Sequence, residues 1–228
     1  MIKMQQTKGL IYLAEKRSGL QTTTLKSLQT LPASNTEINR SADLHGIHRF
    51  SDNLLLGGQS YFPAVKQAAC LVLLPLTGAM EVYHQGKSEL IGIGEIAFLK
   101  IENEGKIQIE NPYLDEAINF LEIWISIPPR YSWQSFLNIF DIEKQANQLI
   151  ALPNSTLPFQ LWIGKFDGRK EEILSLKKEQ KLFAFVIHGA FEFQNRLLEG
   201  RDAVCLWDCE GVEFEALANE SILLLIAC

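Results

Sequence analysis

Three segments of this 228-residue chain recur, in the same order, later in the same chain. The matched pairs are LTGAMEV (76–82) with HGAFEF (188–193), IGIGEIAFL (91–99) with LLEGRDAVCL (197–206), and INFLEIWI (118–125) with ESILLLIA (220–227). Ordered self-similarity of this kind indicates that one structural unit occurs twice. The chain is therefore expected to fold as two related halves.

The repeated segments have the pattern of β-strands. Apolar and polar residues alternate in 79–84 and 96–101, and the apolar run 69–76 ends at Thr77-Gly78. The tripeptide Gln85-Gly86-Lys87 is typical of a hairpin turn. Many short strands with turns at close intervals predict an all-β protein of barrel or sandwich type.

The two halves are separated by a stretch of different composition. Pro128-Pro129 ends the first half, and apolar residues between Tyr131 and Leu152 recur at helix-like spacing. We expect an N-terminal domain over 1–127, a helical or turn-rich connector over 128–157 and a C-terminal domain over 158–228. This division allows the first strands to pack on the C-terminal barrel.

Charge and hydropathy exclude several classes of partner. The chain has 21 Lys and Arg against 27 Asp and Glu, and it has no basic run that would follow a phosphate backbone. It also lacks a signal-like N-terminus and an apolar run long enough to span a bilayer. We therefore predict a cytoplasmic protein with no direct nucleic-acid binding and no membrane association. Its cysteines at 70, 205, 209 and 228 form no C-x-x-C pair, so they are expected to be free thiols.

Several short motifs resemble those of one family. They are IYLAEKR at 11–17, GIHRFSDNLLLGG at 46–58, LTGAMEVYH at 76–84, Gly94-Glu95, FLEIWI at 120–125, PRYSWQSF at 129–136 and EKQANQL at 143–149. Together they are similar to the pirin-like proteins of the cupin superfamily. The resemblance implies a bicupin: two stacked β-barrels of the double-stranded β-helix or jelly-roll type, with a short helical connector.

Metal-bearing members of this family hold an ion with two histidines of an H-x-H motif, an acid, and a later His and Glu. The first motif is framed by glycines, and counting from Gly58 to Gly78 places its ligand positions at Ala64, Lys66 and Leu71, or at Cys70 in a count one residue shorter. Counting from Gly94 and from Asn111 places the later pair at Ile107 and Ile109. Aliphatic and cationic side chains do not bind divalent ions. We therefore predict that the metal site is lost, with no cofactor, and that none of the four histidines, at 45, 48, 84 and 188, falls in a ligand position.

The same positions define a candidate ligand pocket, made of Phe62, Ala64, Lys66, Cys70, Leu71, Ile107 and Ile109. If this stretch is a strand, Lys66 shares an inward face with Ala64 and Ala68. A buried ammonium there would receive an anionic ligand or act as a nucleophile, whereas a Lys66 side chain that reaches the barrel mouth would simply be solvated. Cys70 is expected to be a small buried hydrophobe, and His84 an exposed turn residue. No catalytic residue is assigned.

Three functions remain in competition. The first is a metal-free, non-catalytic pirin-like bicupin that binds a small organic ligand or a protein partner. The second is a quercetinase-like metal-dependent dioxygenase, which requires a different ligand register. The third is an interaction module whose barrel is filled by Leu71, Ile107 and Ile109. Whether the chain is an enzyme is left open, with the missing ligands favouring a negative answer.

Overall fold

The computed structural model describes residues 7–31, 44, 46–152 and 157–228. Within these residues the only helix is the short 3-10 turn η1 (Ala14–Lys16), and the other elements are all strands. The predicted all-β character of the fold is therefore confirmed. No helix in these ranges has the length and apolar character needed to cross a membrane.

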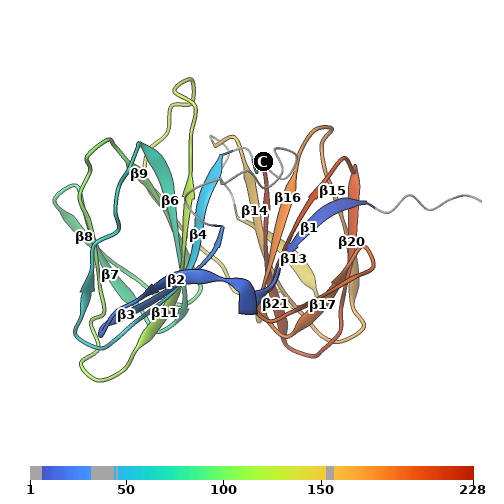
Figure 1. Cartoon of the computed structure of the whole chain (residues 1–228), viewed down its shortest axis with the longest axis horizontal. Helices are drawn as coiled ribbons and strands as arrows, with labels where there is room; N and C mark the ends of the chain where they lie inside the picture. The colour runs from blue at the N-terminus through green and yellow to red at the C-terminus, as the bar shows by residue number, and fades with distance from the viewer. Residues whose placement is uncertain (1–6, 32–43, 45, 153–156) are drawn as a thin grey trace, which may run out of the picture. The chain divides into compact units, whose positions relative to one another are not determined.

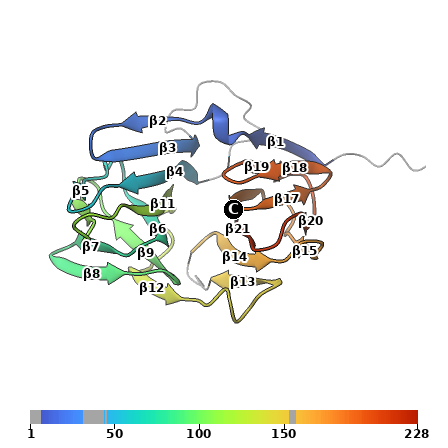
Figure 2. The same cartoon turned by 90° about the horizontal axis from the view of Figure 1, so that it is seen from below.

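The chain divides into two compact units. Residues 17–31 and 46–140 of the described chain form what we call the N-terminal unit, and residues 7–16, 44, 141–152 and 157–228 form the C-terminal unit. This division differs from the expected boundaries at 127 and 157, because the first strand and the connector each contribute strands to a unit. Figure 2 shows β1 (Lys8–Tyr12) beside β19 (Ala203–Trp207), with which it pairs in an antiparallel register.

The N-terminal unit consists of a seven-stranded and a four-stranded sheet. The larger sheet contains, in spatial order, β12 (Phe136–Ile139), β9 (Glu95–Ile101), β6 (Ala69–Thr77), β11 (Ile118–Ile125), β4 (Ile47–Leu55), β3 (Leu25–Leu31) and β2 (Ser18–Gln21). The smaller sheet contains β5 (Ser60–Tyr61), β10 (Ile107–Glu110), β7 (Met80–His84) and β8 (Lys87–Ile91). One apolar cluster draws residues from both sheets, so the sheets face each other across a shared core (Figure 1).

The C-terminal unit repeats this plan. Its six-stranded sheet contains, in spatial order, β1, β19, β16 (Leu182–His188), β21 (Ser221–Ala227), β14 (Gln160–Phe166) and β13 (Gln148–Leu152). Its four-stranded sheet contains β15 (Glu171–Ser175), β20 (Gly211–Ala216), β17 (Ala190–Phe193) and β18 (Arg196–Glu199). The strand orders β9-β6-β11-β4 and β19-β16-β21-β14 correspond, as the matched sequence segments predict.

Equivalent turns join equivalent strands in the two units. Gln85-Gly86 connects β7 to β8, and Gln194-Asn195 connects β17 to β18. All four residues have positive φ, between 48° and 74°, which is the geometry of a type I′ hairpin turn. The predicted hairpin turn at Gln85-Gly86-Lys87 is confirmed.

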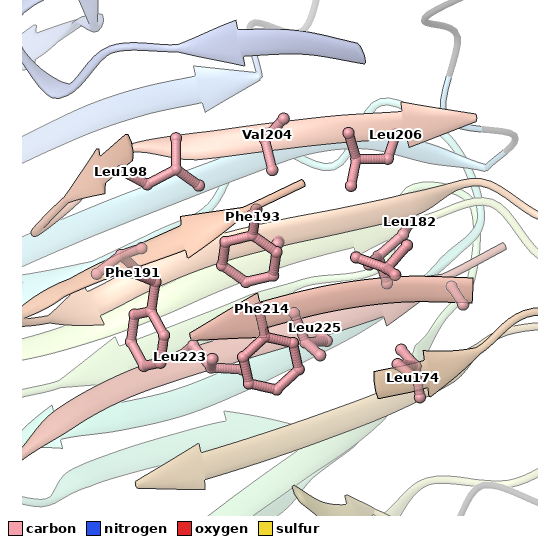
Figure 3. Packing of buried hydrophobic residues seen from close by; sticks show 14 of the residues in the cluster. Leu174, Leu182, Phe191, Phe193, Leu198, Val204, Leu206, Phe214, Leu223 and Leu225 are labelled. Carbon is pink, nitrogen blue, oxygen red and sulfur yellow. The ribbon is translucent and has the colours of Figure 1, made fainter. Parts of the chain in front are cut away.

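The core of the C-terminal unit is aromatic. Phe191 and Phe193 of β17 and Phe214 of β20 lie together with aliphatic residues of the facing sheet, as Figure 3 shows. Phe193 and Phe214 stack with ring centroids 5.2 Å apart. No ionisable side chain belongs to this cluster, so the interior of this unit is a packed apolar core.

The expected helical connector is wrong. Residues 136–139 form β12, which pairs with β9, and residues 148–152 form β13, which pairs with β14. Each strand is only four or five residues long, so a few apolar residues in each, separated by the turn at 142–147, imitate helical spacing. Sheet pairing, a non-local interaction, decides the structure of this segment.

Candidate functional site

The predicted metal positions on β6 and β10 lie in the apolar interior of the N-terminal unit. Leu71, Ile107 and Ile109 are all buried and belong to one cluster with Leu73, Val82 and other aliphatic residues. Successive side chains of a strand point to opposite faces, so Cys70 lies on the other face of β6 and outside this cluster. Burial raises the pKa of the Cys70 thiol, which keeps it protonated and unreactive.

The remaining predicted positions lie between β5 and β6. Residues 62–68 form no strand, and Phe62, Ala64 and Lys66 are exposed. The inward strand face that was expected for Lys66 is therefore wrong, because the alternation of a strand does not apply to an irregular segment. Lys66 instead lies near His48, whose pKa is lowered chiefly by burial and, to a smaller extent, by the charges of Arg49 and Lys66.

The residues at the family's ligand positions do not fit a metal ion. Three of them are aliphatic and packed in the core, and the two on the exposed segment are an alanine and a lysine. In the part of the chain that is described, no three His, Cys, Asp or Glu side chains are close enough to hold an ion together. His45 lies outside the described residues. No step of a metal-dependent reaction can therefore be derived from these side chains.

A buried carboxylate lies on the same interior face. Glu122 of β11 is fully buried, and its side chain points inward with Phe120 and Trp124, the alternate residues of that strand. Oε1 accepts hydrogen bonds from Arg49 Nη2 and from Trp124 Nε1, the latter at 2.6 Å, and Oε2 accepts one from Asn53 Nδ2 at 2.8 Å. The Arg49 guanidinium also lies 4.6 Å from the Trp124 ring centroid. The charge of Glu122 is thus paired and hydrogen-bonded on both oxygens.

This polar cluster adjoins the predicted metal-ligand positions on β6 and β10. Tyr61, the strand partner of Ile109, hydrogen-bonds to Glu122, and the pKa of Tyr61 is raised, first by burial and then by that carboxylate. Trp124 is the strand partner of Leu71. We call Arg49, Asn53, Tyr61, Glu122 and Trp124 the interior polar cluster.

The sequence contains a signal for this cluster that we did not use. In INFLEIWI (118–125) the inward positions are Ile118, Phe120, Glu122 and Trp124, so one acid interrupts an otherwise apolar series. A charge at such a position requires a buried partner. The partner strand IHRFSDNLL (47–55) offers Arg49 and Asn53 at matching alternate positions.

A groove of about 860 Å³ opens between β7, β8, β10 and the segments 62–63 and 102–106. Its apolar lining includes Phe62, Pro63 and Ile107, and its charged lining residues are Lys87, Lys106 and Glu102. Phe62 is 65 % exposed, which is unusual for a phenylalanine without a partner surface. Of the predicted pocket residues, the groove brings together Phe62 and Ile107, and the others do not line it.

His84 also lines this groove. The expectation of an exposed turn residue is wrong, because His84 is the partly buried last residue of β7 and its Nε2 lies 2.9 Å from the carbonyl oxygen of Lys100. A carbonyl can only accept, so Nε2 carries the proton. Nδ1 is buried and has no hydrogen-bond partner within the described residues.

Comparison with known proteins supports the cupin fold of both units. Residues 158–226 match the family described as the quercetinase C-terminal cupin domain. No curated protein matches the sequence. The sequence match therefore lies within the C-terminal unit. For the N-terminal unit, which carries the candidate site, the similarity is one of structure.

Several solved structures have the same fold over nearly the whole chain. YhhW from Escherichia coli has a TM-score of 0.83 at 16% identity, and the alignment covers 96% of this chain and 97% of that one. The bacterial pirin YhhW in complex with nickel(II), also from Escherichia coli, has a TM-score of 0.80 at 15% identity, with coverages of 96% and 98%. Quercetin 2,3-dioxygenase from Acinetobacter baumannii has a TM-score of 0.73 at 12% identity, with coverages of 98% and 87%.

Proposed function

We propose that this pirin-like bicupin acts without a metal and without catalysis, and that it binds a small organic ligand in the groove lined by Phe62, His84 and Ile107. The observation that carries the proposal is the open groove beside the packed interior of the N-terminal unit. Leu71, Ile107 and Ile109 occupy ligand positions with packed aliphatic side chains, while the groove beside them stays open. Its volume is within the range of small-molecule sites, about 300–1,000 Å³.

The interior polar cluster supports a non-catalytic role. A general acid or base has to exchange its proton with a substrate, but both oxygens of Glu122 are engaged and the residue has no exposed surface. Cys70 is a buried thiol with a raised pKa, so it is a poor nucleophile. These side chains maintain the interior of the unit.

Two other functions compete with this one. The similarity of residues 158–226 to the quercetinase C-terminal cupin domain favours a dioxygenase, but the donor set described above opposes it. The filled interior is equally compatible with a protein-interaction module. The groove favours ligand binding over a pure interaction module, because such a module does not need a concave apolar site of this size.

Metal analysis of the full chain, purified without chelator and then incubated with Fe, Mn, Ni or Cu, tests the first half of the proposal. We expect well below one bound ion per chain. The bacterial pirin YhhW, whose structure contains nickel(II), treated in parallel, is the positive control. Stoichiometric metal in this chain would overturn the proposal and favour the dioxygenase.

Binding of the neutral fluorescent probe N-phenyl-1-naphthylamine tests the second half. We expect saturable binding, weakened about tenfold by Phe62→Ser, because that change removes one exposed aromatic contact from the groove. Leu114→Ser is a matched control, since Leu114 is 83 % exposed and does not line the groove. Absence of binding, or equal effects of the two substitutions, would contradict a ligand site here.

A further inference from the structure

We infer that the groove selects apolar organic anions over neutral molecules of the same shape. This inference rests on the proposed function, since it names the ligand class of that groove. The inference rests on the charged side chains that surround the apolar part of the groove lining. Phe62 and Tyr83 supply exposed aromatic area for a hydrocarbon body, and the cationic side chains at the edge supply the preference for charge.

The balance of charge at the groove is positive. Lys87 and Lys106 line it, and neither has an ion-pair partner among the described residues. The one lining carboxylate, Glu102, lies 3.3 Å from the ammonium of Lys100, which offsets its charge. Glu89 of β8 and Glu104 of the 102–106 segment do not line the groove. An anion therefore meets two ammonium groups that have no ion-pair partner in the described chain, and one carboxylate that is paired with Lys100.

A pair of probes isolates the charge. The anion 8-anilino-1-naphthalenesulfonate and the neutral N-phenyl-1-naphthylamine share an aromatic body and differ by one sulfonate group. We expect the anion to bind the full chain about three- to tenfold more tightly than the neutral probe at low salt, because each partly exposed ammonium contributes modestly. The preference should shrink in 0.5 M NaCl through screening.

Substitutions assign the preference to named residues. Lys87→Met/Lys106→Met should remove most of the anion's advantage over the neutral probe, and Lys26→Met, at an exposed lysine of β3 outside the groove, should leave that advantage unchanged.

The outcomes separate the two proposals. If both probes bind equally, and the lysine variants change nothing, the inference about anions is overturned but the ligand site stands. If neither probe binds the folded protein, the proposed ligand site itself fails. A thermal melt of each variant shows that loss of binding is not loss of folding.

Discussion

Arg49 and Glu122 form a buried ion pair inside the N-terminal unit. Their side chains are 11% and 0% exposed. The carboxylate is stabilised by Trp124 and Asn53 as well as by the guanidinium, so its burial is compensated by several hydrogen bonds. Both charges of the pair are thus compensated by neighbouring protein groups.

Removing one member of this pair should be costly. We predict that Arg49→Met lowers the free energy of unfolding by about 3–5 kcal/mol, because it leaves the Glu122 charge buried without its cation. Adding Glu122→Gln should recover most of the loss, since the new amide could donate to Asn53 Oδ1, which has no partner in the described chain. Urea unfolding followed by tryptophan fluorescence measures both.

An exposed pair supplies the control for this experiment. Arg169 and Glu215 form an ion pair in which Arg169 is 84% exposed, so Arg169→Met should cost less than about 1 kcal/mol. A double variant, Arg49→Met/Glu122→Gln, that is no more stable than Arg49→Met would show that the buried charge is not the source of the cost.

Tyr12 should make stability depend on pH in the alkaline range. Burial, and then the nearby Cys205, raise its pKa from 10.0 to about 12. Between these values the unfolded chain loses the Tyr12 proton and the folded chain keeps it, so the unfolded state binds fewer protons and stability falls as the pH rises. We predict that Tyr12→Phe reduces the decrease in the free energy of unfolding between pH 10 and 12.

Tyr12→Phe should leave the pH dependence of the free energy of unfolding unchanged below pH 9. Some alkaline loss should remain, because burial also raises the pKa of Cys228 from 9.0 to about 12. Guanidinium titrations at closely spaced pH values would measure this. An unchanged slope above pH 10 in the variant would contradict the role given to Tyr12.

At the scale of the element, the four-stranded sheet of the C-terminal unit carries a row of acids on its exposed face. Glu171 of β15 lies opposite Glu215 of β20, and Glu215 lies opposite Glu192 of β17. Like charges in directly opposed positions of neighbouring strands are destabilising. Arg169 pairs with Glu215 and offsets part of this repulsion.

Reversing one charge in the row should stabilise the sheet. We predict that Glu192→Lys raises the free energy of unfolding by about 0.5 kcal/mol at low salt, because it converts a repulsive cross-strand pair into an attractive one. Glu179→Lys makes the same change of net charge in a loop of the same unit and should have little effect. Equal gains for both variants, or a gain that survives 0.5 M NaCl, would argue against a local pair.

The limits of strand patterning also appear at this scale. The alternation in 79–84 and in 96–101 predicts β7 and β9, since both are long enough to show period two. The same assumption fails for Lys66, because β5 ends at Tyr61 and the chain then runs irregularly to Ala69. It fails again in the connector, where the strands are too short to be distinguished from helical turns.

At the scale of the whole molecule, the internal repeat is the strongest property of the sequence. It places equivalent strands in equivalent positions of two pairs of sheets, although the two halves share few identical residues. The cores then differ: the C-terminal unit is filled by Phe191, Phe193 and Phe214, and the N-terminal unit keeps a polar cluster. The duplication thus accounts for the shared strand order, whereas the side chains inside each unit differ.

The sequence by itself determined the all-β duplicated fold, the hairpin at Gln85-Gly86 and the aliphatic character of Leu71, Ile107 and Ile109, because periodicity, turn chemistry and residue type are local properties. Only the tertiary structure decided that Glu122 meets Arg49, that His84 reaches the carbonyl of Lys100, and that Phe62 and Ile107 share a groove. Those pairs depend on strand register and on segments that meet across the fold, which one-dimensional spacing does not encode.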